Sequence, residues 1–562
     1  MTTTTALVGS APSAARPPDE RMFPVLTPEQ LRRAGGYGRK RSIDRGEVLV
    51  DVGDQTHRVF IVTEGLLEIV RPSVGGEDFV TALGPGQFTG EVATLSGRPA
   101  FVRIRAVVPG EVIEVDHEHL LSIVQTDSEL SDILMRAFVL RRVELIARGL
   151  GDAVLVGSNH CAGTLRIREF LTRNNHPYSE IDLDREADVQ DLLDRFQVSV
   201  EDIPVLICRG QVVLRNPTNQ QIADCLGFNK SIDVTKARDL VIVGAGPSGL
   251  AAAVYGASEG LDVLVVEASA PGGQAGSSSK IENYLGFPTG ISGNDLAGRA
   301  YAQAQKFGAQ LMVARAVTRL ICARKPYALG LDGTEQVPAR AIIIATGAEY
   351  RKLAIDNLAQ FEGAGVYYSA TPMESQLCRG EEVIVVGGGN SAGQAAVFLA
   401  QATKRVHMLV RSDDLAKSMS RYLIRRIEQH PSIALRFCTE VVGLQGNGHL
   451  EKVASRDART GEVQTHDIRH LFIMAGAVPN TRWLEGCLAL DGKGFIKTGA
   501  DLTQEDLASA HWPLTRMPYL LETSLHGVFA VGDVRSGNLK RVASAVGEGS
   551  IAVALVHRAL LE

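Results

Sequence analysis

The chain has 562 residues, 45% of them hydrophobic and 22% charged, which is ordinary for folded protein. This length predicts roughly three to five domains. A formal net charge of −6 gives no reason to expect a nucleic acid or an anionic membrane surface as partner, and no apolar run reaches the roughly 18 residues of a membrane helix.

Residues 1–22 are rich in Thr, Ser, Ala and Pro and have no basic stretch before an apolar one. This composition predicts a disordered tail and no signal peptide. The seven cysteines of the whole chain are scattered, and none forms a C-x-x-C pair. That pattern argues against a disulfide-stapled secreted scaffold and against a metal site. We therefore expect a reducing, cytoplasmic location.

Residues 23–150 form the first predicted domain. Short alternating runs with glycine turns fill residues 40–115, for example RGEVLVDVGD and HRVFIVTEGLLEIVR. Such spacing predicts a small antiparallel β-barrel or roll. The residues that follow, from HEHLLSIVQ to LIARG, have a helical pattern.

The segment FTGEVATLSGRPAFVRIRA in this barrel resembles the phosphate-binding cassette of cyclic nucleotide-binding domains. The resemblance rests on Gly90, Glu91 and Ala93, and it implies that Glu91 faces a ribose hydroxyl. In that family an arginine after a proline pairs with the cyclic phosphate, whereas Ala100 stands there in this chain and Arg98 lies close by. A barrel that binds a cyclic nucleotide and a degenerate one used for packing or dimerisation are the two alternatives.

Residues 151–230 form the second predicted domain, with elements in the order β-α-β-α-β-β-α. This order resembles the glutaredoxin/thioredoxin fold. The resemblance places Pro204 where that family keeps a cis proline, and Cys161 and Thr164 where it keeps C-x-x-C. A cysteine at a helix N-terminus is expected to have a lowered pKa. Cys161 is therefore a candidate monothiol nucleophile, and a cysteine that only packs is the alternative.

A dinucleotide-binding pattern follows. DLVIVGAG, residues 239–246, is an apolar strand entering a glycine turn, and a helix and a second strand ending in Glu267 come next. In this G-x-G-x-x-G motif Gly244 permits the tight turn, Gly246 lets the backbone approach a pyrophosphate, and Gly249 lets helix and strand pack closely. The helix N-terminus favours the phosphates and Glu267 can bind a ribose 2′-hydroxyl.

The pattern recurs from residue 381, where EEVIVVGG leads into a G-x-G-x-x-A turn made by Gly387, Gly389 and Ala392. The second strand of this unit ends at Arg411, with no carboxylate at the ribose position. An arginine there can pair with a 2′-phosphate, which favours NADPH. An exposed charge at the end of a strand is the competing interpretation.

Two more strands end in turns suited to a flavin. AIIIATG ends at Thr346 and Gly347, and GVFAVGD ends at Gly532 and Asp533. A carboxylate after such a strand can accept a hydrogen bond from a ribityl hydroxyl of a flavin.

Residues 236–562 resemble the low-molecular-weight thioredoxin reductases, on seven motifs in family order: GAGPSG, GGQ, IEN, ATG, GGGNSA, GAVPNT and GVFAVGD. The resemblance implies an FAD domain split into residues 236–350 and 477–562, an inserted NAD(P)H domain at 351–476, and a homodimer. The FAD residues are then Gly244, Gly246, Pro247, Ser248, Gly249, Glu267, Gly273, Gln274, Asn283, Thr346, Gly347, Gly532, Asp533, Arg541 and Val542. The NADPH residues, with NADH as the other coenzyme, are Gly387, Gly389, Asn390, Ser391, Ala392, Arg411 and Lys417.

The chain departs from that family at its redox centre. The family's C-A-T-C aligns with Ser369-Ala370-Thr371-Pro372. Serine cannot cycle through a disulfide, and proline has no side-chain nucleophile. Cys378, six residues further on, is expected to be a small buried residue. The electron acceptor of such a module must therefore lie elsewhere.

The fold class that follows is a multidomain chain with a β-roll, an α/β thioredoxin-like domain and two α/β Rossmann-like domains. Its predicted function is that of an FAD-dependent NAD(P)H oxidoreductase regulated by the N-terminal barrel, with hydride passing from NADPH to FAD. The acceptor is Cys161, a one-electron carrier or a quinone. The alternatives are a non-catalytic redox sensor, and a thioredoxin- or glutathione-disulfide reductase that acts through Cys161.

Overall fold

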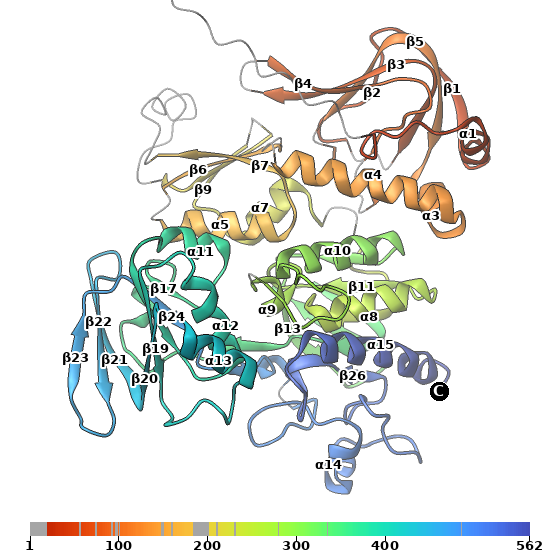
Figure 1. Cartoon of the computed structure of the whole chain (residues 1–562). Coiled ribbons are helices and arrows are strands. Elements are labelled where there is room, and N and C mark those ends of the chain that lie inside the picture. The colour runs from red at the N-terminus through yellow and green to blue at the C-terminus, as the bar shows by residue number, and fades with distance from the viewer. Residues whose placement is uncertain are drawn as a thin grey trace, which may run out of the picture.

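The computed structural model describes residues 20–54, 58–73, 76–90, 94–95, 99–100, 102–147, 151–158, 161–183, 202–209, 212–229, 232–278, 280–333, 335–484 and 486–562. Figure 1 shows a β-roll at the top, a small sheet with helices below it, and two larger α/β units side by side at the bottom. In these ranges no helix is long and apolar enough to cross a membrane.

The N-terminal unit is the predicted antiparallel roll. Its sheet has the order β1-β5-β3-β4, with β2 paired to β5. Phenylalanines 88 and 138 meet edge to face in its core, with ring centroids 6.1 Å apart. Its elements are α1 (Pro28–Gly35), β1 (Arg39–Ile43), β2 (Val48–Val50), β3 (Val59–Ser73), β4 (Gly76–Leu83), β5 (Arg103–Val115), α3 (His117–Thr126) and α4 (Ser128–Ala147).

The second unit is a four-stranded sheet of order β7-β6-β8-β9, in which only β6 and β7 run parallel. The Ile203–Pro204 peptide bond is cis, where the sequence predicts a cis proline. The helix expected at residues 186–198 lies outside the described residues. The elements are β6 (Ala153–Gly157), α5 (Ala162–Arg173), β7 (Tyr178–Asp182), β8 (Val205–Cys208), β9 (Val212–Arg215) and α7 (Asn219–Leu226).

The third unit has a sheet of order β12-β11-β10-β15-β14-β13, and β26 from near the C-terminus pairs with β15. Helices α8 and α15 pack together, since Gly549 leaves room for the backbone of Ser248. The strands are β10 (Arg238–Val243), β11 (Val263–Val266), β12 (Gln310–Met312), β13 (Val317–Ile321), β14 (Tyr327–Leu331), β15 (Gln336–Ile344) and β26 (Val528–Ala530). The helices are α8 (Pro247–Ser258), α9 (Gly273–Gly276), α10 (Gly293–Lys306), η4 (Arg482–Leu484), η5 (Gly499–Asp501), α14 (Gln504–Ser509), η6 (Gly532–Val534) and α15 (Val542–Ala559).

The fourth unit is inserted into the third. It has a parallel sheet of order β17-β24-β18-β19-β20 and an antiparallel meander, β21-β22-β23. The strands are β16 (Ala348–Tyr350), β17 (Val366–Tyr367), β18 (Glu382–Val386), β19 (Arg405–Val410), β20 (Ile433–Phe437), β21 (Thr439–Gln445), β22 (Lys452–Asp457), β23 (Val463–His466), β24 (His470–Ile473) and β25 (Ala477–Pro479). The helices are η3 (Leu358–Gln360), α11 (Pro372–Leu377), α12 (Asn390–Leu399) and α13 (Arg421–Gln429).

The second unit is fixed to the third by paired polar contacts and a shared core. Arg173 at the end of α5 donates to the carbonyl oxygens of Ala270 and Gly273, at 3.2 and 3.0 Å. The side-chain amide of Asn229 both donates to and accepts from the backbone of Val313, at 2.9 and 3.0 Å. Ala270 and Val313 belong to the same apolar cluster as the core of the small sheet. These contacts hold α5 in one place relative to the large sheet.

One disulfide, between Cys322 and Cys487, joins the end of β13 to the loop after η4, with 6.2 Å between the Cα atoms. The scattered cysteines did not predict it. The two residues are 165 positions apart, so only the folding of the C-terminal segment onto the β13–β14 hairpin brings them together. Among the described residues no group of three or more His, Cys, Asp and Glu side chains could hold a metal ion.

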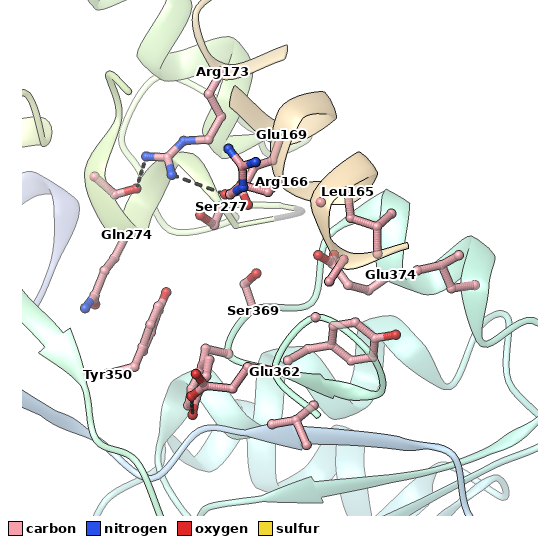
Figure 2. A pocket seen from close by; sticks show the side chains of 18 residues that line it. Leu165, Arg166, Glu169, Arg173, Gln274, Ser277, Tyr350, Glu362, Ser369 and Glu374 are labelled. Atoms are coloured by element: carbon pink, nitrogen blue, oxygen red, sulfur yellow. Dashed lines mark hydrogen bonds and ion pairs between the residues drawn. The ribbon is translucent and has the colours of Figure 1, made fainter. Parts of the chain in front are cut away.

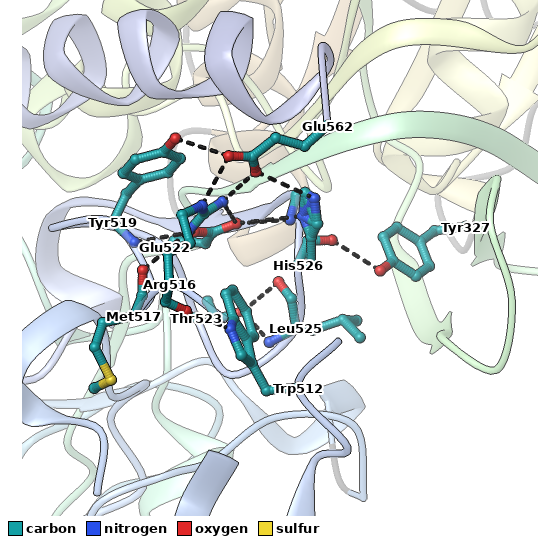
Figure 3. Close-up of polar contacts among 11 residues, drawn as sticks. Tyr327, Trp512, Arg516, Met517, Tyr519, Glu522, Thr523, Leu525, His526 and Glu562 are labelled. Atoms are coloured by element: carbon teal, nitrogen blue, oxygen red, sulfur yellow. Dashed lines mark hydrogen bonds and ion pairs between the residues drawn. The ribbon is translucent and has the colours of Figure 1, made fainter. Parts of the chain in front are cut away.

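A buried ionic cluster ties down the C-terminus, as Figure 3 shows. The Glu522 side chain is fully buried and accepts from Arg516 Nη1 at 2.8 Å and from the Tyr519 amide at 2.9 Å. Arg516 also pairs with Glu562 and lowers the pKa of that carboxyl to about 2. His526 is buried beside these groups, and its burial lowers the pKa of its imidazole.

We predict that this cluster makes the protein less stable in mild acid. The unfolded imidazole has a pKa of about 6.5, and the folded one lies lower. The folded state therefore binds fewer protons, so stability is fully present above about pH 6.5 and falls as the pH drops below it. His526→Gln should flatten the fall of the urea midpoint between about pH 7 and pH 5.5. His449→Gln, at an exposed position, is the control, and an equal slope in both variants would contradict the assignment.

Candidate site at the junction of the flavin fold and the thiol fold

The first glycine turn has the geometry that a dinucleotide needs. Gly244 has a φ of +105°, and a Cβ there would lie 2.4 Å from the Ala345 carbonyl oxygen. A Cβ on Gly249 would lie 1.9 Å from the Gly244 carbonyl oxygen, so the start of α8 can reach β10 only with glycine there. In contrast, a Cβ on Gly246 would meet nothing nearer than 3.8 Å. The face at Gly246 is therefore open to a ligand.

Glu267 lies against this turn at the end of β11. Its Oε2 accepts from the Ala245 amide at 2.8 Å and its Oε1 from the Ser269 amide at 2.9 Å. These two bonds hold the carboxylate beside the turn, where the ribose of a dinucleotide is expected.

Residues 272–276 close the turn from the other side. A Cβ on Gly273 would lie 2.9 Å from Gly246 Cα, so this loop lies directly on the dinucleotide turn. The Gln274 side chain reaches across and donates to the carbonyl oxygen of Ala348 in β16. Gln274 thus links the predicted flavin site to the strand that leads into the inserted unit.

The C-terminal strand brings Asp533 to the same place. Gly532 has a φ of +72°, and a Cβ there would lie 2.3 Å from Ser248 Oγ, at the start of α8. Burial raises the pKa of the Asp533 carboxyl, and a hydroxyl donor from a ligand would offset that cost. The open face at Gly246, the hydrogen-bonded carboxylate of Glu267 and the half-buried carboxyl of Asp533 together fit a bound FAD.

Thr346 and Gly347 lie where the chain leaves this fold. Thr346 Oγ1 donates to the Asn480 carbonyl oxygen at 3.0 Å, on the returning segment. The two crossing segments pair as antiparallel strands β16 and β25. Asn283 and Arg541 are exposed, and Val542 lies with Pro247 in an apolar groove between α8, α10 and α15.

The second glycine turn is built in the same way. Gly387 has a φ of +140°, and a Cβ there would lie 2.4 Å from the Met474 carbonyl oxygen. Gly389 is open, with nothing nearer than 3.9 Å to its Cβ position. The following loop lies over the turn, since the Ser420 amide donates to Asn390 Oδ1 at 2.8 Å. Its geometry fits a second dinucleotide. Ala392 is buried in α12, while Ser391, Arg411 and Lys417 are exposed around the turn.

Ser369, which aligns with the first cysteine of the missing pair, lines a cavity of about 550 Å³. Figure 2 shows Ser369 near its centre, with its hydroxyl directed toward α5. Pro372 begins α11, a position that suits a residue without an amide hydrogen. The cavity is lined by Ala162, Gly163, Leu165, Arg166, Glu169, Arg173, Gly273, Gln274, Ser277, Tyr350, Glu362, Gly363, Val366, Tyr367, Tyr368, Ser369, Glu374 and Leu377.

Cys161 stands directly before this cavity, as the N-cap residue of α5. Its side chain makes no capping hydrogen bond and is half-buried. Cys378 is fully buried, its Sγ donates to the Glu374 carbonyl oxygen at 3.0 Å, and burial raises the pKa of its thiol to about 12. Cys378 is therefore an inert packing residue, as predicted, and Cys161 is the thiol at the cavity.

Several cavity residues were not predicted from the sequence. Burial raises the pKa of the Glu374 carboxyl, while its Oε2 accepts from the Thr371 amide at 2.8 Å. Burial also raises the pKa of Tyr350 to about 12, and the Tyr350 ring stacks on Tyr368 with centroids 5.9 Å apart. None of these residues belongs to a spaced motif. They meet only because three domains meet.

Two parts of the chain match known protein families. Residues 238–549 match the pyridine nucleotide-disulphide oxidoreductase family, and residues 40–127 match the cyclic nucleotide-binding domain. The thioredoxin reductase of Treponema pallidum is 34% identical over 314 residues, which are 56% of this chain and 94% of that protein. NADPH-dependent thioredoxin reductase 3 of Arabidopsis thaliana is 31% identical over 368 residues, and the matched part is 65% of its length.

The structural comparison agrees. The crystal structure of Lactococcus lactis thioredoxin reductase in its FR conformation is 27% identical, with a TM-score of 0.51 over 58% of this chain and 99% of that one. The structure from T. acidophilum has the same TM-score, 0.51. The chain therefore belongs to the pyridine nucleotide-disulphide oxidoreductase family, as an FAD-dependent NAD(P)H oxidoreductase similar to the thioredoxin reductases, with a cyclic nucleotide-binding domain at its N-terminus.

Proposed function

We propose that this enzyme delivers electrons from NADPH to a disulfide held in the cavity beside Cys161. Bound FAD supplies the chemistry, since it accepts a hydride from NADPH and passes on two electrons. One observation carries the proposal. A single cavity is bounded by Gln274 from the predicted flavin site, by Ser369 from the inserted domain, and by the start of α5 next to Cys161.

The flavin would be held by the first glycine turn. Gly246 leaves its backbone open to the pyrophosphate, Glu267 is placed for the adenosine ribose, and Asp533 for a ribityl hydroxyl. NADPH would occupy the second turn, at Gly389, with Arg411 and Lys417 for the 2′-phosphate. Asp413 and Asp414 lie two and three positions after Arg411, and their negative charges weaken the positive field that a 2′-phosphate would meet.

The flavin module needs an acceptor outside itself. Ser369 and Pro372 supply no sulfur, and Cys378 is buried without a redox partner in its helix. A one-electron carrier or a quinone would need a route to the flavin. The start of α5, directly after Cys161, lines the cavity that also contains Gln274. We therefore place a glutaredoxin-like thiol domain at residues 151–230 and take Cys161 as the group that holds the substrate.

We further propose that the N-terminal domain regulates this reaction. Gly90 keeps a φ of +103° and its carbonyl oxygen accepts from Arg141 of α4 at 2.8 Å. Glu91, Ala93 and Arg98 lie outside the described residues. Arg103, the next arginine, is paired with Asp51 and Glu77 at 2.9 and 2.7 Å. With Arg103 committed to these carboxylates, we expect a cyclic nucleotide to bind weakly.

A homodimer and a cytoplasmic location complete the proposal. An apolar groove of about 570 Å³ lies between α8, α10 and α15, and Tyr255, which lines it, is 42% exposed. Such a surface suits a second copy of the chain. The thin scatter of cysteines supports a reducing compartment, whereas the Cys322–Cys487 bridge, the one bridge among the described residues, points the other way.

We predict that the protein purifies with bound FAD and that NADPH bleaches the flavin absorbance within seconds. Gly246→Val should abolish flavin binding, because the side chain would enter the space left for the pyrophosphate. Gly492→Val is the matched control, since its Cβ position is open as well. If FAD is bound but NADPH never bleaches it, the protein is a non-catalytic sensor and the proposed oxidoreductase function is contradicted.

We predict a modest preference for NADPH over NADH. Arg411→Ala should raise KM for NADPH by roughly fivefold, the size of one exposed charge contact, and leave KM for NADH nearly unchanged. Arg405→Ala, at the exposed start of the same strand, should change neither value. Equal changes for both coenzymes would show that Arg411 does not touch the 2′-phosphate.

We predict that anaerobic dithionite bleaches the flavin completely after about two electrons per FAD, where a reductase with its own C-x-x-C takes up about four. The reason is that Ser369 and Pro372 store no electrons. Cys322→Ser opens the Cys322–Cys487 bridge and serves as the control, and it should bleach at the same point. A need for about four electrons in both proteins would reveal a second redox pair at the flavin.

A further inference from the structure

We propose that the cavity at Ser369 is a binding site for a low-molecular-weight thiol, carried as a mixed disulfide on Cys161, and that it excludes protein disulfides. This inference rests on the proposed function but concerns which substrate the site admits. The argument uses the placement of α5, the size and lining of the cavity, and the groups around Cys161.

The chain's own thiol domain covers the face of the inserted domain that carries Ser369. Ala162, Leu165, Arg166, Glu169 and Arg173 all line the cavity. Their spacing of three and four residues puts them on one side of α5. Figure 1 shows α5 lying over α11. A protein of the size of thioredoxin would have to displace this helix to bring its disulfide to Ser369.

The helix is not free to move aside. Arg173 binds the carbonyl oxygens of Ala270 and Gly273 in the flavin domain. At its other end, Ala162 Cβ lies 3.1 Å from the Cβ position of Gly363 in the inserted domain. Both ends of α5 are thus in contact with the reductase module, and what remains between them is a space of about 550 Å³. That volume is typical of small-molecule sites.

The lining suits a zwitterionic ligand of amino-acid type. The carboxylates of Glu169 and Glu374 can accept from an ammonium group. Arg166 adds positive charge to the lining, and its Nη1 and Nη2 already donate to Asn219 Oδ1 and to the Pro217 carbonyl oxygen, at 3.0 and 2.7 Å. The stacked rings of Tyr350 and Tyr368 form a flat wall for the carbon skeleton. Figure 2 shows Arg166, Glu169, Tyr350 and Glu374 around one open space with the Ser369 hydroxyl in the middle.

The start of α5 has a buried hydroxyl three positions after Cys161. Thr164, at the third position of α5, has a fully buried side chain whose Oγ1 has no hydrogen-bond partner in the described structure. The N-cap and third positions of a helix are neighbours in space. Cys161 leaves its own sulfur free of capping bonds. The Thr164 hydroxyl and the first amides of α5 can therefore donate to a sulfur anion at Cys161.

The chemistry balances with NADPH as the only reductant. The Cys161 sulfur attacks a small disulfide RSSR, the ligand S–S bond breaks, a Cys161–SR disulfide forms, and RSH leaves with the proton of Cys161. Two electrons and a proton from NADPH, delivered by way of bound FAD, and one proton from water then yield Cys161–SH and a second RSH. The sum is RSSR + NADPH + H⁺ → 2 RSH + NADP⁺.

The test uses the full-length holoprotein without NADPH, with glutathione disulfide as the probe. Intact-mass measurement should show one glutathione adduct per chain, mapped to Cys161. The adduct should be absent in Cys161→Ser and present in Cys438→Ser, the matched control at another half-buried thiol. Ser369→Tyr, which fills the cavity, should lower the rate of adduct formation by at least about tenfold, because glutathione disulfide loses access to Cys161. Ser509→Tyr, on the exposed end of α14, should not.

Flavin content of each variant shows that it has folded. Oxidised thioredoxin offered in place of glutathione disulfide should give no mixed disulfide with Cys161. An adduct on another cysteine, an unchanged rate in folded Ser369→Tyr, or efficient trapping of thioredoxin on Cys161 would each overturn the inference. Anaerobic NADPH added to the isolated adduct then tests the proposed function separately. If the adduct forms but NADPH does not release glutathione from it, the small-thiol site at Cys161 is supported and electron transfer from NADPH to Cys161 is contradicted.

Discussion

The contact of Arg173 with the carbonyl oxygens of Ala270 and Gly273 sets the arrangement of the functional half of this protein. It joins the last turn of α5 to the loop that lies on the dinucleotide turn. Because Gly273 is in van der Waals contact with Gly246, the same loop positions a predicted flavin-binding backbone and the thiol domain at once. A guanidinium bound to backbone carbonyl oxygens resists displacement, since each donor would lose its partner on leaving. The thiol domain is therefore a fixed wall of the cavity.

The glycines of the two turns fall into two groups, those where a side chain would collide with the backbone and those where the space beside them is open. Gly244 and Gly387 occupy positive φ values with a carbonyl oxygen 2.4 Å from each Cβ position. Gly246 and Gly389 are glycine for the opposite reason, because the space beside them is open. A ligand explains an open glycine better than the fold does, since an alanine there would cost the fold little.

The chain keeps the fold of the thioredoxin reductases, and under the proposed function its thiol chemistry would lie in a different domain, at Cys161. Pro372 is well placed as the first residue of α11, and Glu374 caps the same helix by accepting from Thr371. These residues stabilise the turn where a cysteine pair would stand. The half-buried thiol next to this cavity is Cys161, the N-cap residue of α5. Under the proposed function, a cavity within one chain would replace an encounter between two proteins, and a cavity of that kind selects by size.

The sequence alone predicts both glycine turns, Glu267 and Asp533 after their strands, the β-roll, the cis proline before β8, and the buried state of Cys378. Each of these depends on residues that are close in sequence, where strand period, glycine spacing and helix caps act locally. Only the tertiary structure decided that α5 covers Ser369, that Tyr350 and Glu374 share a cavity with Arg166, and that Cys322 meets Cys487. The two cysteines of the disulfide are 165 positions apart in the sequence. The cavity residues come from three different parts of the chain. No local pattern encodes them, because they follow from how already folded surfaces pack against one another.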